Sequence, residues 1–361
     1  MNGLAILPSY TEYFNLNVAT TGLNNAAVWM GGISGCLFMQ PIPDYLGRKN
    51  AIVASAMICF VGAILQGASQ NIAMFIIARF IIGAGSQLSS GAAPALLGEL
   101  LPSKTRGRIL GFFFSCYYVG SLVVSIINYG SQNIPSTWAW RLPSLLQIVP
   151  SLISLCLLPF VPESPRWLIA KGKHNHAREV LMIVQNKESV NSDAVTRAFD
   201  NIDLAITIEK EVSPGNPWVE IGKGRANQKR LAVLLSFGVM IQLLGNFVVS
   251  YVTFLSNYQP VAANIHSFYL GKILTQAGIT NTKTQTQIQV IISCWSLFVA
   301  CCGSYMLDHI GRRMQTLGSI AGMIITLFIL GGMVKSKSPV CLDLMVSSLL
   351  LTHLPLLNSF W

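Results

Sequence analysis

The chain has 361 residues, of which 52% are hydrophobic and only 11% are charged, and its mean hydropathy is +0.54. Soluble domains carry about 25% charged residues, so this composition excludes an ordinary water-soluble protein. The net charge of +10 would suit a nucleic-acid-binding protein. However, the basic residues stand at the ends of apolar segments, which is typical of membrane proteins, so we expect a lipid bilayer and no nucleic acid as the partner.

Long uncharged stretches recur along the whole chain. A membrane-spanning helix needs about 20 apolar residues, and a segment that crosses lipid must be helical to satisfy its own backbone. Eight stretches meet this requirement, and we predict spans at 22–42, 51–69, 73–97, 109–130, 141–161, 231–250, 286–307 and 315–334. The sequence therefore predicts an all-α integral membrane protein that crosses the bilayer several times.

A polar stretch separates the first five predicted spans from the rest. Within residues 163–230, the segments 174–186 and 192–211 place apolar residues at helical spacing with charges between them. We predict two amphipathic cytoplasmic helices there. The chain then divides into an N-terminal transmembrane half at 1–162, a cytoplasmic linker at 163–230 and a C-terminal transmembrane half at 231–361.

One short motif occurs twice, each time between two predicted spans. DYLGRK at 44–49 and DHIGRR at 308–313 share an acid, a glycine and two adjacent bases. The glycines, Gly47 and Gly311, allow a tight turn. Repetition between halves is common in transporter folds. The bases are Arg48, Lys49, Arg312 and Arg313; on the simplest alternative they act only as orientation signals that keep their loops in the cytoplasm.

Further motifs complete a recognisable order. They are RFIIGAG at 79–85, the stretch from Pro94 through Glu99 to Arg106, and PESPRW at 162–167. In this order and spacing, the chain resembles the sugar-porter branch of the major facilitator superfamily, especially fungal hexose and disaccharide permeases. The resemblance runs from residue 1 to about 334 and implies the major facilitator fold.

The resemblance implies a cytoplasmic gate of ion pairs that holds the outward-open state and is broken as the two halves rock. The alternative for Glu163 and Arg166 is a solvated helix end. The residues expected in the gate are Asp44, Gly47, Arg48, Lys49, Glu99, Arg106, Glu163, Arg166, Asp308, Gly311, Arg312 and Arg313.

The resemblance also implies a sugar site between the halves. Gln242 and Asn246 lie four residues apart on one helix face, and Gly245 between them allows close approach. Hydrogen bonding between helices, without contact to a substrate, is the alternative for these amides. Ser121 stands where many hexose porters carry Gln, which leaves the identity of the sugar open. We expect Asn128, Trp138 and Trp140 to be interfacial anchors.

Arg79 interrupts an otherwise uncharged run. A charge at membrane depth is costly unless it is paired, so it indicates function, and snorkelling to the interface is the alternative. In proton-coupled relatives the matching Arg pairs with an Asp of the first helix. The resemblance implies that this Asp, if present, lies upstream of Met1.

Three segments depart from the family pattern. The first span is shortened, residues 251–267 interrupt a helix and fit a translated intron or an extracellular loop, and residues 335–361 no longer resemble the family. We therefore expect an incomplete fold of about 8–9 of 12 transmembrane helices. A polypeptide of this kind is expected not to transport by itself.

The leading function is secondary active transport of a hexose or disaccharide, coupled to protons, by a monomer in the plasma membrane. The alternatives are a non-transporting sugar sensor and a carrier of a polyol, quinate or drug on the same fold. No nucleophile or metal constellation includes the five histidines, so we expect no enzyme, no cofactor and no metal. The eight cysteines lie in apolar stretches and are expected to be small buried hydrophobic residues.

Overall fold

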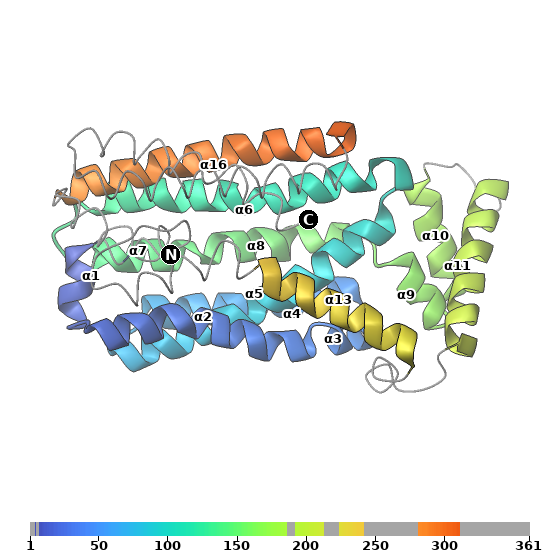
Figure 1. Cartoon of the computed structure of the whole chain (residues 1–361), viewed down its shortest axis with the longest axis horizontal. Coiled ribbons are helices and arrows are strands. Elements are labelled where there is room, and N and C mark those ends of the chain that lie inside the picture. The colour runs from blue at the N-terminus through green and yellow to red at the C-terminus, as the bar shows by residue number, and fades with distance from the viewer. Residues whose placement is uncertain (1–3, 5–6, 186–191, 213–223, 242–280, 311–361) are drawn as a thin grey trace. The chain divides into compact units, whose positions relative to one another are not determined.

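The computed structural model describes residues 4, 7–185, 192–212, 224–241 and 281–310, and the regular elements in these residues are all helical (Figure 1). Contacts divide the chain into two compact units. Unit 1 comprises Met1–Val18, Gly107–Ser144 and Ser236–Trp361, and unit 2 comprises Ala19–Arg106 and Leu145–Leu235. Each unit is described by itself.

The helices of each unit have the following bounds. Unit 1 contains α1 (Pro8–Tyr13), most of α6 (Ser103–Ser131), most of α7 (Trp138–Leu146) and α16 (Thr282–Ile310). Unit 2 contains α2 (Val18–Phe38), α3 (Pro41–Leu46), α4 (Arg48–Gly67), α5 (Ile72–Leu100), α8 (Ile148–Leu157), the short 3₁₀ helix η2 (Leu158–Phe160), α9 (Pro165–Ala170), α10 (His174–Val184), α11 (Asp193–Val212) and most of α13 (Arg225–Ile241).

Five described stretches are long and apolar enough to cross a membrane, and each coincides with a predicted span. They are Arg48–Gly67, Ile72–Leu100, Thr105–Ser131, Trp138–Phe160 and Thr282–Gly303. The span predicted at 22–42 is α2, which begins at Val18 and is 21 residues long. It is not among these five stretches, and polar side chains, among them Asn24 and Asn25, are buried in its first half. The predicted span 315–334 and the second half of 231–250 lie outside the described residues.

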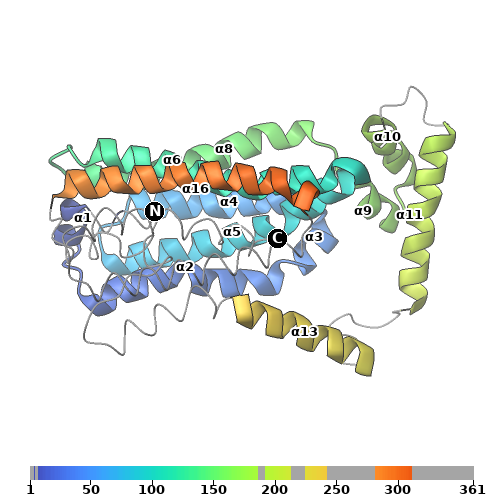
Figure 2. The ribbon, with the colours of Figure 1, turned by 45° about the horizontal axis from the view of Figure 1, so that its top comes forward.

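Helices α2, α4 and α5 pack closely in unit 2 (Figure 2). A side chain at Gly31 would collide with the backbone carbonyl of Phe80, and one at Gly83 with that of Val28. The backbones of α2 and α5 therefore touch, as small residues allow in membrane helix pairs. This contact brings the carbonyl of Asn24 on α2 within reach of side chains on α5.

The two amphipathic helices predicted in the polar linker are present as α10 and α11. Together with α9 they enclose an apolar cluster of Leu168, Ile169, Ala177, Val180, Leu181, Val195, Phe199 and Ile206. In Figures 1 and 2 the three helices gather as a group. Because their apolar faces point at one another, the charged faces stay in water, as the helical spacing of the sequence predicts.

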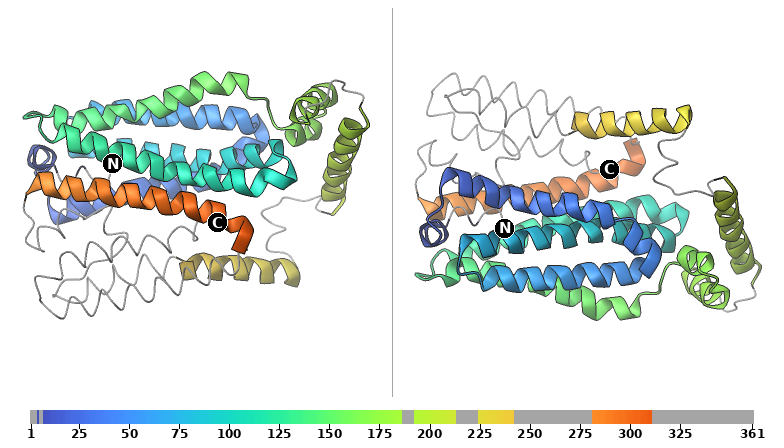
Figure 3. Two further views of the ribbon diagram at one scale, coloured as in Figure 1. Left: turned by 90° about the horizontal axis from the view of Figure 1, so that it is seen from above. Right: turned by 90° about the horizontal axis from the view of Figure 1, so that it is seen from below.

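In unit 1, α6 and α16 run side by side in all three views of the ribbon (Figures 1, 2 and 3). At one end of the unit, Tyr10, Tyr13 and Phe14 surround Trp140, with ring centroids 5.1–6.0 Å away. Trp140 is fully buried, so its expected role as an interfacial anchor is wrong. The aromatic residues of the chain start cover it, and a single sequence does not show that contact.

Two other expectations about burial are also corrected. Asn128 is fully buried and is no interfacial anchor, whereas Trp138 is 54% exposed. Six of the seven cysteines in the described part of the chain are exposed, although burial was expected for them. The reason is the solvent: in a bilayer, apolar side chains can face lipid tails, so an apolar environment does not require the protein interior.

Candidate functional site

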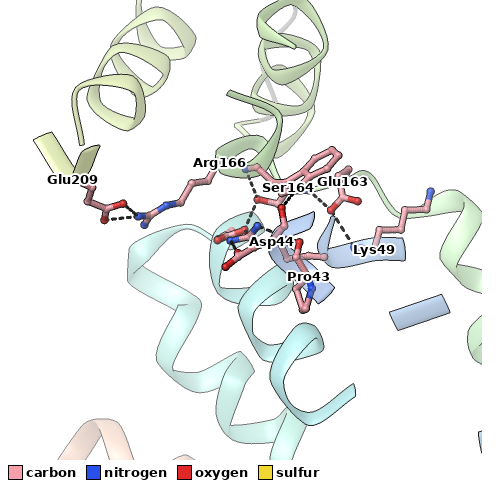
Figure 4. Close-up of polar contacts among 10 residues, drawn as sticks. Pro43, Asp44, Lys49, Glu163, Ser164, Arg166 and Glu209 are labelled. Atoms are coloured by element: carbon pink, nitrogen blue, oxygen red, sulfur yellow. Dashed lines mark hydrogen bonds and ion pairs between the residues drawn. The ribbon is translucent and has the colours of Figure 1, made fainter. Parts of the chain in front are cut away.

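Charged side chains from α3, α4, α5, α9 and α11 meet at one end of unit 2, which the positive-inside pattern predicts to be cytoplasmic (Figure 4). We call this group the charge cluster. It consists of Asp44, Arg48, Lys49, Glu99, Glu163, Ser164, Arg166 and Glu209. All of its members belong to unit 2.

Arg48 and Glu99 each stand at an unfavourable end of their own helix. Arg48 begins α4, whose first turn contains no acid, and Glu99 is the second-last residue of α5. A cation at a helix N-terminus and an anion at a C-terminus both oppose the helix dipole. The Nε of Arg48 lies 3.4 Å from a carboxylate oxygen of Glu99, and both side chains are largely shielded from water. The pair offsets both unfavourable charges.

Arg48 also contacts α3, the helix before its own. Its Nη2 lies 3.2 Å from the Asp44 carboxylate, and its Nη1 donates to the carbonyl of Pro43 at 3.4 Å. Asp44 is much more exposed than Glu99. Arg48 therefore bridges an outer and an inner carboxylate.

Glu163 supplies α4 with a helix cap that α4 lacks in its own sequence. Its Oε1 accepts the backbone N–H of Lys49 at 3.0 Å, which is one of the free donors at the start of a helix. Gly47 makes room for this contact, because it has φ 102° and a Cβ there would strike the Glu163 carboxylate. The glycine is thus required both by the backbone and by the acid beside it.

Ser164 joins three elements and was not singled out by the sequence. Its hydroxyl caps α9 by accepting the backbone N–H of Trp167 at 3.1 Å, and it donates a short hydrogen bond to the Glu99 carboxylate. The Nε1 of Trp167 donates to the carbonyl of Asp44 at 3.0 Å. In the sequence, Ser164 stands out only as one residue of the PESPRW motif. A serine before a helix indicates a helix cap, but nothing in the sequence indicates its contact with the distant Glu99.

Arg166, expected among the gate residues, makes its direct contact with α11. Its Nη2 donates to both carboxylate oxygens of Glu209, at 2.5 and 2.7 Å. Hydrogen bonding to Glu209 raises the pKa of Arg166. Glu209 carries no motif signal, since it is one of several acids on an amphipathic helix. Arg106 donates instead to the carbonyl of Leu101, the residue that follows α5, at 3.3 Å.

Arg79 lies inside unit 2 and is 3% exposed, which excludes snorkelling to the interface. Its Nη1 donates to the carbonyl of Asn24 at 3.1 Å, and its guanidinium lies 5.6 Å from the centre of the Phe75 ring. The close crossing of α2 and α5 makes the first contact possible. A buried guanidinium held by α2 fits a residue that responds to movement of that helix.

A second polar region lies between α6 and α16 of unit 1, and we call it the hydroxyl–amide seam. The Ser125 and Ser293 hydroxyls are 2.8 Å apart, the Thr286 hydroxyl donates to Gln132 Oε1 at 2.9 Å, and the Gln287 amide donates to the Tyr129 hydroxyl at 3.4 Å. The seam consists of Ser125, Asn128, Tyr129, Gln132, Thr286, Gln287 and Ser293.

Asn128 differs from the rest of the seam. Neither its amide nitrogen nor its amide oxygen has a hydrogen-bond partner among the described residues, although the side chain is fully buried. Such a group costs free energy unless a ligand or water completes its hydrogen bonds. Ser121, the predicted sugar-binding position, is exposed and lies on the same face of α6, seven residues earlier. The sequence missed Asn128 because it resembled an interfacial residue.

Several predicted site residues cannot be placed. Gln242, Gly245, Asn246, Gly311, Arg312 and Arg313 lie outside the described residues, and only the backbone of Asp308 is described, within α16. In the part of the chain that is described, no group of three or more His, Cys, Asp or Glu side chains could hold a metal ion.

The comparisons with known proteins agree with this architecture. A family model described as "Sugar (and other) transporter" matches residues 1–349. The chain therefore belongs to the sugar transporter family. It is 28% identical to sugar transport protein MST7 of Oryza sativa subsp. japonica over 90% of the chain and 59% of that protein. It is 30% identical to the high-affinity glucose transporter of Kluyveromyces lactis over 91% of the chain and 56% of that protein.

A third relative, myo-inositol transporter 2 of Cryptococcus neoformans, is 29% identical over 86% of the chain and 53% of its own length. The chain thus spans somewhat more than half the length of these curated relatives. Plant and fungal proteins match at similar identity, so the matches do not single out the fungal branch that the sequence suggested.

Among solved structures, the chain resembles the major facilitator proton:xylose symporter XylE bound to 6-bromo-6-deoxy-D-glucose. The TM-score is 0.78 at 21% identity, and the match covers 99% of this chain and 76% of that one. The inward-open form of XylE from E. coli matches with a TM-score of 0.70. The chain has the major facilitator fold and is a multi-pass membrane protein, and both its family and its fold are those of transporters.

Proposed function

We propose that the chain provides the sugar-binding and cytoplasmic gating parts of a secondary active sugar transporter that works by alternating access. The observation that carries this proposal is the charge cluster. It joins the ends of two long apolar helices to a cytoplasmic helix, through contacts that are partly open to water. A gate requires such contacts, because they must break and re-form as the protein changes its conformation.

The cluster supports a role in switching because some of its residues contact more than one partner. Arg48 faces both Asp44 and Glu99, and Glu99 in turn accepts from Ser164. A movement of α9 that withdraws Ser164 would free Glu99 to change its pairing with Arg48. The expected counterpart at 308–313 carries the same acid, glycine and bases, and we propose that it works in the same way in the second half.

For the substrate, we propose a sugar held by Asn128 together with Gln242, Gly245, Asn246 and Ser121. Amides match paired hydroxyl groups because each offers both donors and an acceptor. The unpartnered amide of Asn128 is the structural support for this site. A polyol is the second candidate, since a myo-inositol transporter is among the relatives. Myo-inositol, like a sugar, presents a ring of hydroxyl groups to such amides.

Arg79 supports coupling to protons. A buried cation that is fixed to the backbone of α2 biases any acid near it toward its charged form, and a change in that acid would act on α2. We propose the plasma membrane as the location and a monomer as the working form, with no enzymatic activity.

A binding measurement tests the sugar site. We supply hexoses, disaccharides or myo-inositol in turn to the purified chain and expect its thermal unfolding midpoint to rise. At 100 times the Kd, a bound sugar should increase the free energy of unfolding by about 2.7 kcal/mol. Asn128→Ala should abolish the shift, whereas the control Ser296→Ala, at a buried serine that bonds only within α16, should keep it. Absence of a response to every sugar and polyol would contradict the proposal.

A pH series tests the coupling. Sugar binding to the wild-type chain should depend on pH, and Arg79→Gln should flatten that dependence. An unchanged pH profile in the variant would remove Arg79 from the mechanism. Binding without any uptake by cells that carry a full-length version would favour a sugar sensor instead.

A further inference from the structure

An aromatic and basic surface lies beside the charge cluster in unit 2, and the transport mechanism does not use it. Its centre is Trp167, which is held by hydrogen bonds at its backbone and at its indole ring. The Trp167 backbone N–H donates to Ser164, and its Nε1 donates to the Asp44 carbonyl at 3.0 Å. The ring is therefore a rigid platform between α9 and α3.

Two lysines are held over this platform. The Nζ of Lys171 lies 6.0 Å from the centre of the Trp167 ring and 5.5 Å from that of Tyr45, and the Nζ of Lys173 lies 5.5 Å from the Trp167 ring. Cation–π attraction places both ammonium groups on one indole despite their mutual repulsion. Neither lysine has an acidic partner among the residues that the structure describes. The arrangement offers a site for an anion.

The nearest acids do not neutralise the pair. Asp44 is engaged by Arg48, and Glu163 accepts the backbone N–H of Lys49 at the start of α4. The Lys49 ammonium donates to the Pro159 carbonyl at 3.1 Å, which adds a third positive charge beside η2. All of these residues belong to the same unit.

Exposed apolar side chains lie at the end of the span that the Lys49 ammonium contacts through Pro159. Phe160 is 86% exposed, Tyr45 78% and Leu157 59%, and the membrane-crossing stretch Trp138–Phe160 ends at this point. Aromatic side chains at the end of a span lie at headgroup level, and lysines there face the anionic lipids of the cytoplasmic leaflet. Exposed apolar side chains at this end of the unit favour a lipid over a soluble anion, because acyl chains can cover them.

We propose that Lys171 and Lys173, positioned by Trp167 and Tyr45, bind the headgroup phosphate of an anionic phospholipid while its acyl chains lie against Leu157 and Phe160. The lipid is bound next to the Asp44 carbonyl contact of Trp167 and so stabilises the position of α9 against α3. Membrane composition thereby acts on the same elements that carry the charge cluster.

The test uses the full chain in detergent with added phosphatidylserine or phosphatidylcholine, with bound lipids counted by native mass spectrometry. We expect phosphatidylserine to bind in preference. The double variant Lys171→Gln/Lys173→Gln should weaken that binding about 25-fold, at about fivefold for each lysine. The matched control Lys210→Gln/Lys283→Gln removes the same charge from exposed positions elsewhere and should leave it unchanged.

Equal retention of phosphatidylserine by the double variant and the wild-type chain would overturn the proposal. Competition by soluble glycerophosphoserine at the same concentration would assign the site to a free phosphate, and competition by an acidic peptide would assign it to a protein partner, so either result would also overturn it. A measurement on the wild-type chain alone guards against misfolding of the variant. Phosphatidylserine with a photoreactive headgroup should label Tyr45 or residues 157–173, and labelling confined to other parts of the chain would refute the site.

Discussion

The two polar regions of this chain solve the problem of burying polar groups in different ways. The charge cluster of unit 2 uses ionised side chains, and its members range from Arg48, 16% exposed, to Asp44, 63% exposed. The hydroxyl–amide seam of unit 1 uses neutral groups, and Ser125 and Thr286 are almost wholly buried. The inner members of the seam are therefore better shielded than the charge cluster, whereas Gln287 at the edge of the seam is exposed.

This difference determines what each region can do. Charges beside water can exchange one partner for another at small cost, because solvent compensates for a broken pair. Neutral groups between two membrane helices have no such alternative, so their hydrogen bonds hold α6 and α16 in register. The first region is suited to switching and the second to maintaining a site, and four substitutions test that contrast.

The largest effect is expected for Gly47→Ala. The new Cβ would strain a backbone at φ 102° and collide with the Glu163 carboxylate, so we expect a loss of about 3 kcal/mol in the free energy of unfolding. Thermal and denaturant unfolding in detergent measure this loss. Gly98→Ala in α5 is the matched control, because nothing lies within 4 Å of its Cβ position, and it should be neutral or stabilising. Equal effects of the two changes would refute the role given to Gly47.

A smaller loss is expected for Glu99→Gln. The change leaves Arg48 without its inner carboxylate, so we expect a loss of about 2 kcal/mol, below the range for fully buried pairs because both side chains retain some exposure. The exposed acid Glu211, changed to Gln, is the control and should have little effect. An unfolding midpoint that stays at the wild-type value would show that the charge cluster does not stabilise this end of the unit.

The seam should respond more weakly. Ser293→Ala removes one hydrogen bond between α6 and α16, and we expect a loss of about 0.6 kcal/mol. A double-mutant cycle with Ser125→Ala checks it, since the second change should add little once the first has broken the contact. Ser296→Ala removes only a hydrogen bond within α16 and serves as the control. Fully additive losses at Ser125 and Ser293 would mean that the two hydroxyls do not stabilise each other.

The smallest effect on stability is expected for Glu209→Gln. The Arg166–Glu209 pair is largely exposed, so we expect about 0.3 kcal/mol at low salt. The difference between variant and wild type should vanish near 1 M salt, where the Debye length is about 3 Å. Unfolding measured across a salt series tests this. A difference that persists at high salt would show that the contact is shielded from water and belongs with the inner part of the cluster.

Some residues of the site were accessible from the sequence. Arg48, Glu99 and Glu163 belong to motifs, and the structure brings them together within one unit. Ser164 and Glu209 were not accessible. The first acts as a helix cap in a loop, and the second is one acid among several on an amphipathic helix. Both acquire their contacts only when α9 packs beside α5 and α11.

Burial was the property that the sequence predicted least well. Trp140 and Asn128 were expected at the interface and are fully buried, and most described cysteines were expected inside and are exposed. Hydropathy reports whether a residue tolerates an apolar surrounding. It does not report whether that surrounding is protein or lipid.

The sequence by itself determined the solvent of this protein, the helical class, most of the described spans and the family motifs. These follow from the length of uncharged stretches and from the need of a backbone in lipid to form its own hydrogen bonds. Only the tertiary structure decided that Glu163 caps α4, that Arg79 binds the α2 backbone and that Asn128 lacks a described partner. Those facts depend on which helices touch, and contact between distant segments leaves no periodic trace in a single sequence.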